Sequence, residues 1–176
     1  MRNRFMPTGQ KVRPKYGLGF EQVKCGKQLT VGHGGAALGF SSRTVFDPQR
    51  QLSVTLFMNA HSEPEIDLAR GLFGLLDFFT EHGAPPARRA KYAGRYANLW
   101  GVSDIVAAAD GLYFTSPGSS MPLNAPDRFQ EKDGQYIIPR TNNFNSIGQP
   151  VGFTVKNGKA VELSWGGSRM RRVVKD

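Results

Sequence analysis

Residues 29–42 read LTVGHGGAALGFSS, and the interpretation of the first half of the chain depends on this stretch. It contains four glycines and His33, placed where a strand would otherwise continue. Glycine inside a strand costs conformational entropy and contributes no packing, so the cluster indicates that something approaches the backbone closely, with a substrate as the natural candidate. Spacing alone leaves open a tight glycine-rich turn. A phosphate-binding loop is a weaker alternative, because no Lys-Ser or Lys-Thr pair follows.

The sequence on both sides of this stretch predicts an antiparallel meander followed by a helix. Segments rich in β-branched and aromatic residues, separated by turn residues, predict strands at residues 16–25, 28–31, 38–46 and 52–59. Ser62 and Glu65 form a capping-box pattern at the start of the helix, and apolar residues then recur at helical spacing until Gly83 ends it. We expect this helix to pack on the apolar face of the meander.

The second half of the chain has a different pattern. Residues 84–90 contain paired prolines and small or polar residues, which predicts an exposed linker. Beyond it, short strands alternate with Asp-Gly, Asn-Gly and Gly-Gly pairs typical of hairpins. The predicted class is therefore α+β: an antiparallel sheet with a packed helix in residues 1–83, then a small all-β barrel of lipocalin-like type, or a sandwich, in residues 91–176.

Composition limits the possible partners. The net charge is +9, but the basic residues are scattered and accompany no nucleic-acid motif, so we expect no nucleic-acid partner. The longest apolar stretch, residues 72–79, is far too short to span a membrane, and no secretory signal is visible, so the compartment is undetermined. One cysteine and no carboxylate or cysteine cluster near the histidines predict neither a metal nor a cofactor.

Five landmarks occur in order along residues 16–59: YGLGF at 16–20, GHGG at 32–35, GFSS at 39–42, DP at 47–48 and MN at 58–59. Together they resemble the third-motif region of β-lactamase-like serine hydrolases of the penicillin-binding-protein or class C type. The resemblance covers about residues 16–80. Residues 92–174 also resemble, less specifically, the small β-rich domain that follows the hydrolase domain in many such proteins.

The resemblance implies roles for four residues. His33, Gly34 and Gly35 match the family's Lys-Thr-Gly type motif, with histidine replacing lysine, so His33 would donate a hydrogen bond or a positive charge toward the substrate. Histidine has an ordinary pKa of about 6.5, so such a role would depend on pH. The glycines would leave room for the acyl group, and the backbone N–H of Ala36 would be an oxyanion-hole donor.

The departures from the family pattern define the expected function. None of the eleven serines has a lysine three positions later, so the family's Ser-x-x-Lys nucleophile motif is absent. We therefore expect the C-terminal part of a serine hydrolase that acts on ester, amide or D-amino-acid peptide substrates through an acyl-enzyme, with β-lactams as a further candidate class. We expect this part to be inactive alone, and to self-associate or to bind a complementing N-terminal segment. Members of the family that it resembles are often periplasmic or secreted.

Two functions of other classes stay open at this point. The first is a non-catalytic ligand- or protein-binding module that uses the β-rich domain. The second is a nucleic-acid binder driven by the positive charge, whose mark would be a steep salt dependence of binding.

Overall fold

The computed structural model describes residues 15–60, 65–118, 123, 126–138 and 147–174. It is rich in β-structure, with two helices and two antiparallel sheets, which is the predicted α+β class. The chain divides into two compact units, residues 1–77 and 78–176, and the division falls within helix α1 (Glu65–His82). The expected boundaries at residues 83 and 91 stay a prediction.

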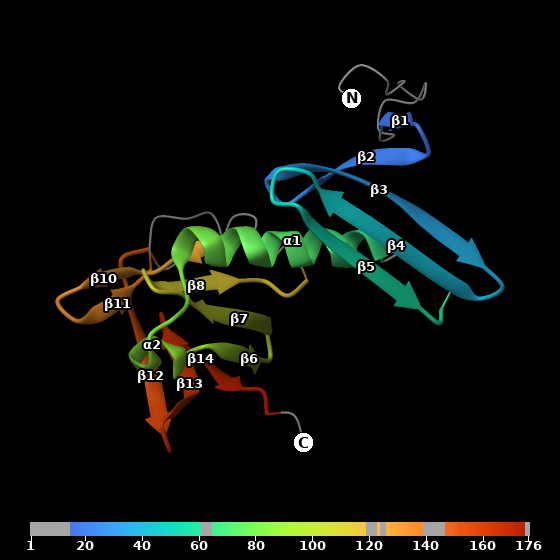
Figure 1. Cartoon of the computed structure of the whole chain (residues 1–176). Helices are drawn as coiled ribbons and strands as arrows, with labels where there is room; N and C mark the ends of the chain where they lie inside the picture. Colours follow the sequence, from blue (N-terminus) through green and yellow to red (C-terminus); the bar gives the residue numbers. More distant parts are fainter. Residues whose placement is uncertain (1–14, 61–64, 119–122, 124–125, 139–146, 175–176) are drawn as a thin grey trace. The chain divides into compact units, whose positions relative to one another are not determined.

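The first unit contains a five-stranded meander whose strands follow one another in sequence order (Figure 1). Its strands are β1 (Lys15–Gly17), β2 (Phe20–Cys25), β3 (Gln28–Ala37), β4 (Phe40–Asp47) and β5 (Leu52–Met58). The predicted first strand is in fact a hairpin, because Leu18 and Gly19 turn the chain with φ values of 56° and 80°. The predicted strand at residues 52–59 agrees with β5 to within one residue, whereas the one at 28–31 extends to Ala37 and the one at 38–46 begins only at Phe40.

Strand β3 does not stop at the glycine cluster. It runs on to Ala37 and pairs with β4 residue by residue from Val31 to Ala37. The turn comes later, at Leu38 and Gly39, where φ is 50° and 85°. Of the four glycines in residues 29–42, Gly32, Gly34 and Gly35 are therefore paired strand residues, and Gly39 lies in the tight turn.

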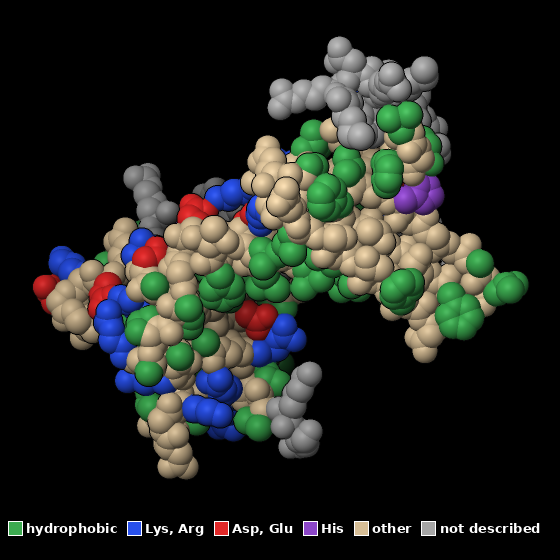
Figure 2. All heavy atoms as spheres, in the orientation of Figure 1, with side chains coloured by type: hydrophobic (Ala, Val, Ile, Leu, Met, Phe, Trp, Pro, Cys, Tyr) green, Lys and Arg blue, Asp and Glu red, His purple; other side chains and the backbone are tan. Residues whose placement is uncertain are grey.

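One face of this sheet forms a core and the other is exposed. Helix α1 contributes the buried Ala69 and Phe73 to a cluster with Cys25, Val45 and their apolar neighbours. The opposite face presents large apolar side chains to solvent, including Phe57 at 83% exposure and Phe40 at 61%. Figure 2 shows that apolar side chains are visible over much of this unit. Each Å² of buried apolar surface contributes about 25 cal/mol to stability. The sheet face that packs against α1 is therefore the main source of this unit's stability.

The two predicted ends of helix α1 have different outcomes. The predicted capping serine, Ser62, lies outside the described residues. The C-terminal stop is as predicted: Gly83 takes the left-handed conformation with φ 71°, and its N–H donates to the carbonyl oxygen of Phe79 at 3.0 Å.

The second unit contains a nine-stranded sheet in the order β10-β11-β12-β13-β14-β6-β7-β8-β9. Its strands are β6 (Gly94–Asn98), β7 (Gly101–Ala107), β8 (Leu112–Thr115), β9 (Asp127–Arg128), β10 (Gln130–Lys132), β11 (Gln135–Ile137), β12 (Pro150–Lys156), β13 (Lys159–Trp165) and β14 (Ser168–Arg172).

This sheet is nearly closed into a barrel. Its two edge strands, β9 and β10, are joined by the single residue Phe129, and consecutive Cα atoms are only about 3.8 Å apart. The two edges therefore lie close together. The core contains the buried Phe129, Tyr96, Leu112 and Leu163. A β-rich barrel was predicted here, whereas its lipocalin-like type stays a prediction.

The hairpin signals of the second unit have different outcomes. Asp133-Gly134, Asn157-Gly158 and Gly166-Gly167 all have positive φ at both residues and join neighbouring strands, as the sequence predicted. Gly111 instead ends the longer connection between β7 and β8. In the stretch expected as an exposed linker, Ala87–Ala90 forms the short helix α2, and Arg89 is buried because it donates hydrogen bonds to the Ala109 carbonyl and to Glu131.

The close packing at Gly32 gives a stability prediction. A Cβ atom at Gly32 would lie 2.0 Å from the carbonyl oxygen of Thr44, so Gly32→Ala must separate β3 from β4. We expect it to lower the free energy of unfolding by about 3 kcal/mol in urea titrations. Gly71→Ala is the matched control, since a Cβ at that helical site meets nothing within 4 Å and should stabilise by about 1 kcal/mol. A Gly32→Ala chain as stable as the parent would contradict this packing.

Candidate functional site

His33 lies on the outer half of β3, where that strand has one described neighbour. Strand β2 pairs with β3 only as far as Gly32, which is opposite Glu21, whereas β4 continues alongside to Ala37. His33 is opposite Thr44 and is exposed on the sheet face that α1 does not cover. The predicted site residues 33–36 are thus consecutive on one exposed strand segment.

Both ring nitrogens of His33 have partners. Nδ1 lies within hydrogen-bonding distance of the carbonyl oxygen of Gly34, and Nε2 lies 3.1 Å from the hydroxyl of Tyr16 on β1. The Tyr16 and His33 rings also meet edge to face, with centroids 5.7 Å apart. A carbonyl oxygen only accepts, so Nδ1 carries the proton of the neutral ring and Nε2 accepts from the Tyr16 hydroxyl.

The two glycines of the motif face opposite sides of the sheet. A Cβ at Gly34 would lie 2.9 Å from the guanidinium carbon of Arg43, which crosses β3 at this point. Beyond β3 the guanidinium reaches Glu21 on β2, with Nη1 2.6 Å from the carboxylate. The space above Gly34 is therefore filled by the protein's own Arg43, which corrects the expectation that this glycine leaves room for an acyl group.

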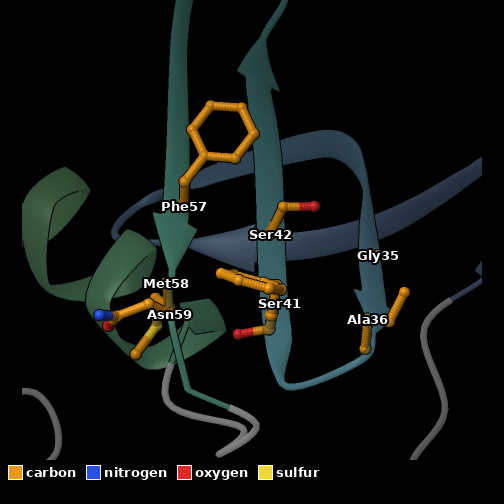
Figure 3. A pocket seen from close by; sticks show the side chains of 9 residues that line it. Gly35, Ala36, Ser41, Ser42, Phe57, Met58 and Asn59 are labelled. Carbon is orange, nitrogen blue, oxygen red and sulfur yellow. The ribbon is translucent and has the colours of Figure 1, made fainter.

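Gly35 faces the same side as His33 and has more room. A Cβ there would meet only the Ser42 hydroxyl, at 3.0 Å. Gly35 and Ala36 line an open hollow of about 620 Å³ at the ends of β3, β4 and β5. The hollow is also lined by Ala37, Phe40, Ser41, Ser42, Phe57, Met58 and Asn59, and none of the lining residues is charged (Figure 3).

The two serines of the hollow have no base to activate them. Figure 3 shows Ser41 and Ser42 pointing in different directions from β4. The Ser41 hydroxyl is buried and donates to the carbonyl oxygen of Ala60 at 3.0 Å. Among the described residues, neither hydroxyl is hydrogen-bonded to a lysine or histidine that could take its proton. A serine without such a base is a weak nucleophile.

A second polar cluster lies within the barrel unit, and no motif in the sequence indicated it. Tyr113 donates to the Asp110 carboxylate at 2.8 Å, and His82 Nδ1 lies 3.1 Å from the same oxygen. Burial opposes ionisation of Asp110, yet the bonds from Tyr113 and His82 and the charge of Arg128 hold its pKa below the usual value. Burial and the Asp110 carboxylate raise the pKa of Tyr113. The lowered pKa of Asp110 and the raised pKa of Tyr113 both favour a neutral tyrosine that donates to a charged carboxylate. We therefore interpret this cluster as structural.

The described residues also bear on metals and membranes. Across the ranges that the structure describes, no three His, Cys, Asp or Glu side chains gather closely enough to hold a metal ion. Within the same ranges, no helix has the length and apolar character needed to cross a membrane.

Comparison with known proteins gives structural likenesses only. No family model matches the chain, and no curated protein matches it. Among solved structures the chain is similar to SurE with D-Leu, at 23% identity and a TM-score of 0.35, over 90% of this chain and 39% of that one. A second structure of SurE gives 22% identity and a TM-score of 0.35, over 90% and 37% of the two chains.

A third likeness is to the octameric penicillin-binding protein homologue from Pyrococcus abyssi. Here the identity is 18% and the TM-score 0.34, over 89% of this chain and 36% of that one. The chain thus spans less than two fifths of the length of each of these three proteins. A penicillin-binding protein homologue is among its structural neighbours, while membership of the β-lactamase-like family stays a prediction.

The Arg43–Glu21 pair gives a prediction about the site strand. The side chains are 15% and 27% exposed, so Glu21→Gln leaves a mostly buried guanidinium with a weaker partner. We expect a loss of about 2 kcal/mol in the free energy of unfolding, since hydrogen bonds to charged groups contribute about 1.5–3 kcal/mol. The exposed pair Arg70–Asp67 is the control, and Asp67→Asn should cost less than about 0.5 kcal/mol. Equal losses would show that Arg43 is not held across β3.

Proposed function

We propose that this chain supplies the third-motif strand of a β-lactamase-like serine hydrolase, and that it is catalytically silent without a nucleophile from elsewhere. The hydrolase would cleave ester, amide or D-amino-acid peptide substrates through an acyl-enzyme, with β-lactams as a further candidate class. The main support is that His33, Gly35 and Ala36 lie together on an exposed strand segment, with Gly35 and Ala36 bordering the hollow. In the family that the sequence resembles, the corresponding strand lines the cleft.

The chemistry of the hollow fits substrate positioning more than catalysis. Its lining is uncharged and partly aromatic, which suits an apolar acyl group, and the small Gly35 leaves the floor open. In this proposal the backbone N–H of Ala36 donates to the oxyanion of the tetrahedral intermediate, and such a donor typically contributes about 2.7–4 kcal/mol to lowering the barrier.

The proposal requires a nucleophile, and a base that activates it, from a complementing segment. The sequence contains no Ser-x-x-Lys, and the serines nearest the hollow have no hydrogen-bonded base in the described structure. A complementing segment would have to bring both groups to the exposed side of β3. The exposed Phe40 and Phe57 on the same sheet face would be covered by such a segment or by self-association.

A fluorophosphonate probe tests the proposal. The full chain is incubated with the probe and its intact mass is measured, while turnover of a p-nitrophenyl ester and of a chromogenic cephalosporin is followed in parallel. We expect no adduct and no turnover above buffer, because the sequence has no Ser-x-x-Lys motif and the two serines of the hollow have no hydrogen-bonded base in the described structure. A chain unfolded in urea serves as the control for nonspecific labelling.

One labelling result would contradict the proposal. A stoichiometric adduct on the folded chain, absent from the unfolded control, would show that the chain holds its own nucleophile and that it is not silent. Ser41→Ala and Ser42→Ala would then identify the residue, since these two hydroxyls are nearest to Gly35 and Ala36 in the hollow.

A binding module is the second candidate, and one observation favours it. The barrel unit has its own hollow of about 500 Å³ beside Phe129, where the two edge strands are joined. Arg128, Glu131 and Lys132 are among its lining residues, so it suits a polar ligand better than an apolar one. This function would need no nucleophile.

A further inference from the structure

We infer that Tyr16 is a positioning residue of the His33 site: its hydroxyl donates to Nε2 and so holds the ring whose Nδ1 is directed at the Gly34 carbonyl oxygen. This inference rests on the proposed function, because it assigns Tyr16 a role in the same site. Tyr16 belongs to the Tyr-Gly-Leu-Gly-Phe stretch at residues 16–20, which sequence reasoning used only as a landmark.

The geometry determines the hydrogen-bond directions. His33 Nδ1 is next to the Gly34 carbonyl oxygen, which has no proton to give, so the neutral ring must be protonated at Nδ1. Nε2 then has a lone pair, and the Tyr16 hydroxyl at 3.1 Å is the group that donates to it. The edge-to-face ring contact, with planes at 70°, holds the two rings in this relation.

The arrangement changes what the site can present to a substrate. The resemblance implied that His33 itself donates toward the substrate, but in the neutral ring Nδ1 is bound to Gly34 and Nε2 accepts from Tyr16. The oxygen of Tyr16 therefore lies over the only ring nitrogen that could point outward. Any group that approaches Nε2 must replace the Tyr16 hydroxyl or bind to it.

Strand topology explains why Tyr16 can reach His33. The turn at Leu18 and Gly19 folds β1 back antiparallel to β2, so Tyr16 is opposite Glu21, and Glu21 is in turn opposite Gly32. Tyr16 is thus two strands away from the residue that precedes His33. This register starts the Tyr16 side chain on the face of Glu21, and its hydroxyl meets His33 Nε2 beyond the point where β2 stops pairing with β3.

The test is the tautomer of His33, read from the ¹⁵N resonances of its imidazole in the full chain at a pH where the ring is neutral. Protonated and unprotonated ring nitrogens resonate well apart, and His33→Gln assigns the signals among the three histidines. We expect Nδ1 to be the protonated nitrogen in the parent chain. In Tyr16→Phe, which keeps the ring and removes the hydroxyl, Nδ1 should stay protonated and the Nε2 shift should move toward that of a nitrogen with a free lone pair.

The controls separate a positioning role from a general effect on folding. Phe40→Leu changes an exposed aromatic residue of the same sheet that does not contact His33, and it should leave the His33 shifts unchanged. His82, whose Nδ1 lies 2.9 Å from the Tyr113 hydroxyl, is an internal reference that should stay constant in all variants.

Two results would overturn the inference: Nε2 as the protonated nitrogen of the parent chain, or unchanged His33 shifts in Tyr16→Phe. Neither measurement involves ester turnover or probe labelling. A failure of the hydrolase proposal would therefore be seen in the fluorophosphonate experiment, and a failure of the Tyr16 assignment would be seen here.

Discussion

The close approach of β3 and β4 at Gly32 is the constraint on which the candidate site depends. There the carbonyl oxygen of Thr44 occupies the place that any side chain at residue 32 would need. With this contact, β3 stays paired with β4 for five residues beyond the point where β2 ends. His33, Gly35 and Ala36 are exposed because they lie on that extension.

The extension is then fixed by side chains distant in sequence. On the face that α1 covers, Arg43 crosses over Gly34 to Glu21 and so links β4 to β2 across β3. Tyr16 of β1, which is paired with Glu21, reaches His33 with its hydroxyl. Each of these links needs a small residue or a free strand edge at β3, so the glycine cluster is explained first by the protein's own packing and only at Gly35 by open space.

Local patterns in the sequence predicted most of the elements. Gly83 ended the helix and three of the paired turn signals formed hairpins, because these effects depend on residues adjacent in the chain. The split of residues 15–25 into two strands was missed, since Leu18-Gly19 is not a typical turn pair and Leu18 is a non-glycine residue with positive φ. The helical turn at 87–90 was missed because the buried Arg89 finds its partners 20 and 42 residues away.

The candidate site itself stays a prediction. The structure places residues 33–36 on a strand that the sequence pattern had ended at Val31, with Gly35 and Ala36 beside the hollow. The sequence could not show that Arg43 fills the space at Gly34 or that Tyr16 holds the His33 ring, because these contacts depend on the register between strands.

The most direct test of this account is hydrogen exchange of the backbone amides of β3 in the full chain. If residues 33–37 are a paired strand, alternate amides in this range donate to β4 and exchange far more slowly than those of the turn at Leu38 and Gly39. Uniformly fast exchange across residues 33–37, with protection confined to residues 28–32, would show that β3 ends at the glycines and would contradict the account.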